Sequence, residues 1–122
     1  MEWEIVIHGQ DGYVEVVTGG IADQDGSLAM AKTISQTMRT NRITRALIDH
    51  RNLERVVGHT ADIYNRSKIF RLIGVILHIR IAEIIKPEHL EHFRFFETVC
   101  RNQGYQLSIF QDKDLALFWL LA

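Results

Sequence analysis

The chain has 122 residues, of which 47% are hydrophobic and 24% charged, as is typical of a single globular domain. Its formal net charge of −1 gives no electrostatic reason to expect a nucleic acid or an anionic membrane surface as a partner. A single cysteine, Cys100, excludes an internal disulfide, and the acidic N-terminus has no signal-peptide pattern. No apolar run reaches the roughly 18 residues that a membrane span needs. We therefore expect one cytoplasmic domain over residues 1–122 with no membrane span.

The first residues predict an antiparallel hairpin. Apolar side chains alternate with others over residues 2–7, as they do in a strand. An Asp-Gly pair within residues 9–12 favours a tight turn, and residues 13–17 form a second strand. The Gly19-Gly20 pair is expected to end that strand.

Strand–helix units follow the hairpin. Helical spacing of apolar residues predicts a first helix that Asp25 or Ser27 caps and that fades at residues 40–42. Residues 46–50 form the third strand. Thr60 is a good N-terminal cap for a second helix, which Gly74 ends.

The last third of the chain repeats the alternation. Residues 78–85 form the fourth strand, Pro87 opens a third helix that Gly104 ends, and residues 105–110 form the fifth strand. Asp112 caps a last helix. Its expected buried side consists of Leu115, Ala116, Trp119 and Leu120. The order ββαβαβαβα predicts an α/β fold with a mostly parallel five-stranded sheet and an antiparallel N-terminal strand.

Polar residues interrupt strands that a doubly covered sheet would fill with apolar ones. Gln106 and Ser108, for example, alternate with apolar neighbours in the fifth strand. We therefore expect helices on one sheet face and a largely open second face that pairs with another copy in a homodimer. The apolar residues expected on the open face are Val6, Val17, Leu47 and Ala82.

Three stretches resemble the small bacterial STAS-like proteins, which have the SpoIIAA-like fold. They are residues 47–53, residues 60–64, and residues 93–99 with 101–105 after them. With residues 110–112 and 119–120 the likeness covers most of the chain. The resemblance implies a SpoIIAA-like (STAS-type) domain that acts by binding, since members of this fold bind partner proteins, nucleotides or lipids. Anti-sigma-factor antagonists of this fold carry a phosphorylatable serine after the third strand. Here that region has no serine, and Thr60 is the hydroxyl in a comparable place.

Candidate site residues gather where the third strand ends, since ligands and partners of α/β sheets usually bind at that edge. Asp49, His50 and Arg51 lie at the strand end, and His59 and Thr60 lie where the second helix starts. Arg51 is a candidate donor to an anion or a partner, with Asp49 orienting it. The alternative is an Asp–Arg pair that only fixes the loop. Thr60 is a plain helix cap or a phosphate acceptor.

Three functions fit these residues. The first is a non-enzymatic STAS-like regulatory or protein-interaction module that binds a protein partner through the loop from Asp49 to Thr60. The second is a domain that binds a small ligand, a lipid or a nucleotide, between the second and third helices. Its pocket would be lined by Phe70, Phe93 and Phe96. The third and weakest is a small hydrolase that uses Asp49 and His50.

No cofactor or metal is expected. His89 and His92 are spaced three apart, which is not the His-Glu-x-x-His pattern, and no third ligand is apparent. We expect both to be exposed in the first turn of the third helix. Cys100 lies on that helix's apolar stripe, which favours a core thiol over a nucleophile.

Overall fold

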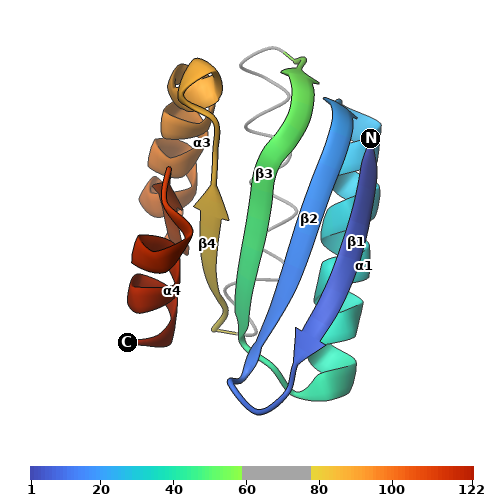
Figure 1. Ribbon diagram of the computed structural model, residues 1–122, viewed down its shortest axis with the longest axis vertical. Helices are drawn as coiled ribbons and strands as arrows, with labels where there is room; N and C mark the ends of the chain where they lie inside the picture. Colours follow the sequence, from blue (N-terminus) through green and yellow to red (C-terminus); the bar gives the residue numbers. More distant parts are fainter. Residues whose placement is uncertain (59–77) are drawn as a thin grey trace.

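The computed structural model describes residues 1–58 and 78–122 (Figure 1). These residues contain a five-stranded sheet with the order β1-β2-β3-β4-β5. β1 and β2 pair antiparallel, and every other neighbouring pair is parallel. The elements are β1 (Glu2–His8), β2 (Tyr13–Ala22), α1 (Gln24–Asn41), β3 (Arg45–Val56), β4 (Arg80–Ile84), α3 (Leu90–Asn102), β5 (Gln106–Phe110) and α4 (Lys113–Leu121). The predicted α/β class and mixed sheet are confirmed.

Some predictions fall on residues outside those ranges. The helix expected between Thr60 and Gly74 is one of them. The candidate residues His59, Thr60 and Phe70 also lie outside the described part of the chain.

The ribbon formed by β2 and β3 is longer than the sequence suggests. The Gly19-Gly20 pair does not end β2, because the strand passes through register shifts on both sides of this pair and continues to Ala22. Gly20 has a φ of 75°, which glycine adopts without steric cost. β3 accompanies β2 as far as Val56, so residues 51–56 extend the strand beyond its predicted end at His50. Leu53, which is 0% exposed, anchors this extension.

α1 starts earlier than predicted. Its N-cap is Asp23, whose Oδ1 accepts a hydrogen bond of 2.7 Å from the backbone N–H of Gly26. Asp25 therefore lies in the first turn, where a negative charge also suits the positive end of the helix. Asp112 caps α4 as expected and accepts a hydrogen bond from the backbone N–H of Leu115. None of the helices in the described ranges is long and apolar enough to span a membrane.

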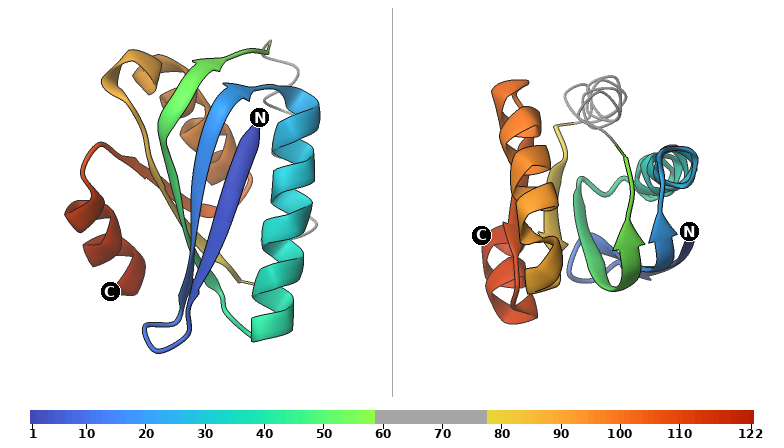
Figure 2. Two further views of the ribbon diagram at one scale, coloured as in Figure 1. Left: turned by 45° about the vertical axis from the view of Figure 1, so that its right-hand side comes forward. Right: turned by 90° about the horizontal axis from the view of Figure 1, so that it is seen from above.

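Helices cover both faces of the sheet, which corrects the expectation of one open face (Figure 2). α1 and α3 pack on the face that carries Val14, Val16 and Ile48. We call this the inner face. α4 packs on the opposite, outer face through Ala116 and Leu120.

The outer face is therefore only partly open. α4 covers Leu47 and Ala82, both 0% exposed, because it folds back over β3 and β4. Val6 on β1 is 51% exposed, as expected. Leu115 is 62% exposed and not buried as predicted, since it lies one position off the i, i+4 stripe on which α4 packs.

Candidate functional site

The predicted cluster of Asp49, His50 and Arg51 lies in the middle of β3, and the strand separates its side chains. Successive side chains of a strand point to opposite faces of the sheet. His50 points to the inner face, whereas Asp49 and Arg51 point to the outer face. Asp49 and His50 therefore do not form the pair that the hydrolase hypothesis requires.

Asp49 and Arg51 bind each other on the outer face. Arg51 donates to Asp49 from its backbone N–H at 3.0 Å, from Nε at 2.9 Å and from Nη2 at 2.8 Å. Burial alone raises the pKa of the Asp49 carboxyl, but the hydrogen bonds and charge of Arg51 outweigh it and lower that pKa. The hydrogen bond to Asp49 in turn raises the pKa of Arg51. This geometry matches the alternative in which the pair fixes the backbone.

A second set of polar contacts joins α4 to the outer face. Lys113 Nζ donates to Glu15 Oε2 at 2.9 Å, and His8 Nε2 lies 2.9 Å from Glu15 Oε1. Burial raises the pKa of Glu15, yet the hydrogen bonds from Lys113 and His8 outweigh it and lower that pKa. We call Glu15, Asp49, Arg51 and Lys113 the outer cluster. Both carboxylates of this cluster accept hydrogen bonds from a cationic side chain, Glu15 from Lys113 and Asp49 from Arg51.

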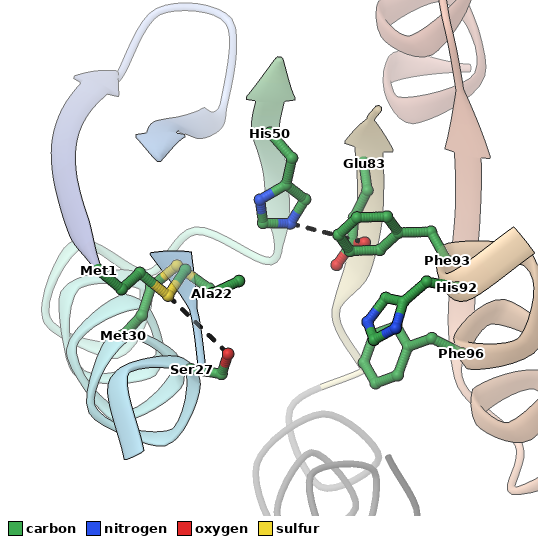
Figure 3. A pocket seen from close by; sticks show the side chains of 9 residues that line it. All are labelled: Met1, Ala22, Ser27, Met30, His50, Glu83, His92, Phe93 and Phe96. Carbon is green, nitrogen blue, oxygen red and sulfur yellow. Dashed lines mark hydrogen bonds and ion pairs between the residues drawn. The ribbon is translucent and has the colours of Figure 1, made fainter. Parts of the chain in front are cut away.

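His50 is fixed on the inner face by two neighbours. Its Nδ1 lies 2.8 Å from Thr18 Oγ1, and its ring stacks on Phe93 with centroids 4.9 Å apart and planes 18° apart. Thr18 and His50 are 1% and 4% exposed. The ring is thereby held with Nε2 directed toward β4 (Figure 3).

Glu83 lies on β4 beside His50, where Ile48 and Glu83 are register partners. Its Oε2 is 3.7 Å from His50 Nε2, which is too long for a hydrogen bond. Glu83 is 3% exposed, and its Oε2 has no hydrogen-bond partner. Carboxylates are almost never fully buried unless they are paired, so this oxygen requires an explanation.

A cavity of about 30 Å³ lies against Glu83 and His50, between α1 and α3 (Figure 3). By this measure it holds one or two water molecules or a small polar group. Its described lining is Met1, Ala22, Ser27, Met30, His50, Glu83, His92, Phe93 and Phe96. Apart from Ser27, Glu83 and the two histidines, these side chains are apolar, and none of them is Lys or Arg.

The sequence prediction found part of this site. The structure places Phe93 and Phe96 in the cavity wall, together with residues of α1, β3 and β4. Thr18 and Glu83 were missed as site residues. Glu83 could have been found in the sequence, because it is the one acidic residue within the otherwise apolar residues 81–85.

The remaining candidates contribute no metal site. In residues 1–58 and 78–122, no three His, Cys, Asp or Glu side chains gather in a way that could hold a metal ion. His89 is 9% exposed rather than exposed as expected, because a 3-10 turn over Pro87–His89 precedes α3 and turns this side chain inward. Cys100 is 0% exposed in the core, as its place on the apolar stripe predicted.

Comparison with known proteins identifies the fold. Neither a scan of protein-family models nor a search of curated proteins finds a match. Among solved structures, the chain is similar to the crystal structure of an uncharacterised DUF3478-family protein with a SpoIIAA-like fold from Shewanella loihica PV-4. The match has a TM-score of 0.58 and covers 98% of this chain and 92% of the other. The fold is SpoIIAA-like. At 21% sequence identity the likeness establishes the fold and carries no function with it.

Proposed function

We propose that this chain is a non-enzymatic binding domain that holds a small, mainly apolar ligand in the inner-face cavity. The observation that supports the proposal most is the Glu83 carboxylate, which is 3% exposed, lines the cavity and has one oxygen without a hydrogen-bond partner. Leaving a buried acceptor unsatisfied costs about 1–3 kcal/mol. Such a cost is typical of a site that is completed by a ligand.

The chemistry of the cavity wall supports the same function. Ligand sites are usually apolar concavities with a few polar groups that fix orientation. Here Met30, Phe93 and Phe96 supply apolar surface, and His50 and Glu83 supply polarity at one end. The volume of about 30 Å³ accepts a head group. A longer ligand displaces the side chains of Met1 and Met30, which are unbranched and adapt readily.

Thermal unfolding with three probes tests this function. Hexylamine, 1-hexanol and hexanoate share one apolar body and differ in their head groups. A ligand that binds the folded state raises the unfolding midpoint, so we expect at least one probe to do so. Ser27→Phe adds a ring at the cavity wall and should abolish the shift. Thr33→Phe, at an exposed position of the same helix, should keep it. No shift with any probe, or equal shifts in both variants, would contradict the proposal.

A second candidate is the protein-interaction module, for which α4 offers a surface. Leu115 and Phe118 on its outer side are 62% and 80% exposed, and large exposed apolar side chains are typical of contact surfaces. A second copy of the chain is the partner we propose. Sedimentation velocity should then show a dimer that Phe118→Ser converts to a monomer. A monomeric wild-type chain at millimolar concentration would remove the homodimer.

A further inference from the structure

We infer that the inner-face cavity selects ligands whose head group is a protonated amine, and that the Glu83 carboxylate receives this group. The inference rests on the proposed binding function and names the class of ligand. It follows from the balance of donors, acceptors and charges around the cavity.

Among the described residues that line the cavity, Glu83 leaves one acceptor for the ligand. Glu83 lines the cavity, and its buried Oε2 has no hydrogen-bond partner. His50 Nε2, its neighbour, is 3.7 Å away and does not satisfy it. An ammonium group of the ligand at hydrogen-bonding distance from this oxygen would form a charge-assisted bond, the strongest kind available there.

The contacts of Thr18 hold the His50 ring in place beside Glu83. The Thr18 hydroxyl donates to the Asp49 carbonyl oxygen at 3.3 Å and lies 2.8 Å from His50 Nδ1. The other ring nitrogen, Nε2, is then directed toward Glu83 but remains 3.7 Å from Oε2. His50 therefore leaves this oxygen of Glu83 without a hydrogen bond.

The rest of the wall favours a cation over an anion. The described lining contains no Lys or Arg, so the carboxylate or phosphate of an anionic ligand would face Glu83 without a compensating cation. Phe93 and Phe96 add aromatic surface to this wall, and aromatic rings attract a positive charge over their faces. An alcohol head would find the same acceptor but would bring no charge.

Titration calorimetry near neutral pH with the three hexyl probes tests the inference. We expect the wild-type chain to bind hexylamine about tenfold more tightly than 1-hexanol. A hydrogen bond between charged groups is stronger than a neutral one, and the difference in free energy corresponds to about tenfold in affinity. Hexanoate should bind most weakly. The affinity for hexylamine should fall about tenfold in Glu83→Gln, whereas the affinity for 1-hexanol should change less than about threefold.

Glu15→Gln is the matched control. It removes a partly buried carboxylate from the outer face, away from the cavity, and should leave hexylamine affinity unchanged. Equal affinity for the three heads, or hexylamine binding that is insensitive to Glu83→Gln, would overturn the inference while leaving the proposed function in place. Absence of binding by every probe would overturn both.

Discussion

The two faces of the sheet differ in the hydrogen bonds that their buried and partly buried carboxylates receive. On the outer face, Glu15 and Asp49 receive short hydrogen bonds from Lys113 and Arg51. On the inner face, Glu83 has an oxygen without a donor beside a cavity. These carboxylates lie on the neighbouring strands β2, β3 and β4. On the outer face the donors come from α4 and from β3 itself. The contact between Glu15 and Lys113 attaches α4 to the outer face, whereas the proposed function assigns the open acceptor of Glu83 to a ligand.

The largest effect should come from the packing of the outer face. Leu47→Ala removes a side chain that is 0% exposed beneath α4, and we expect it to lower the free energy of unfolding by about 3 kcal/mol. Urea unfolding measures this change. Val6→Ala, at a position 51% exposed on the uncovered part of the same face, should cost less than about 0.5 kcal/mol. Similar losses in the free energy of unfolding for the two variants would contradict the division of the outer face into a covered and an open part.

A smaller effect is expected from the outer cluster. Asp49→Asn removes the charge that Arg51 binds and should cost about 1 kcal/mol near neutral pH, because the Arg51 side chain is 45% exposed and water partly replaces its partner.

This cost should depend on pH in a definite direction. The pKa of Asp49 is lowered in the folded state, so its contribution is fully present above the unfolded pKa of about 4. It is lost as the pH falls through the folded pKa. The difference between wild type and Asp49→Asn should therefore shrink in urea unfolding at acid pH. A difference that persists at about pH 2 would contradict the role of the Asp49 charge.

The smallest effect should have the opposite sign. Glu83→Gln removes a buried charge whose Oε2 has no partner, so we expect the free energy of unfolding to rise by up to about 1 kcal/mol. Glu15→Gln, which breaks a satisfied contact, should lower it. Chemical denaturation of the two variants side by side measures the contrast. If Glu83→Gln lost as much stability as Glu15→Gln, Glu83 would stabilise the fold in the same way as Glu15, and this expectation would be contradicted.

Local signals made most of the fold predictable. The hairpin, the Asp112 cap and the alternation of strands and helices each depend on residues within a few positions of one another. The length of β2 was missed because a bulge carries the strand past Gly19-Gly20. The open face was overestimated because the position of α4 over Leu47 depends on tertiary packing and not on local pattern.

The site was harder to predict than the fold. Asp49, His50 and Arg51 were selected because the sequence predicts a strand end there, but β3 continues to Val56. The alternation of side chains along the strand also separates His50 from the other two. Thr18 and Glu83 contact His50 from neighbouring strands, and such contacts between distant residues leave no mark in sequence spacing. The inner site therefore became visible only once the sheet register was known.

A crystal structure of the chain with hexylamine tests the central claim most directly. We predict the amine nitrogen within about 3 Å of Glu83 Oε2, with the alkyl chain against Met30 and Phe96. An amine bound elsewhere would contradict this account. So would a ligand-free crystal in which a side chain of the protein itself donates a hydrogen bond to that oxygen.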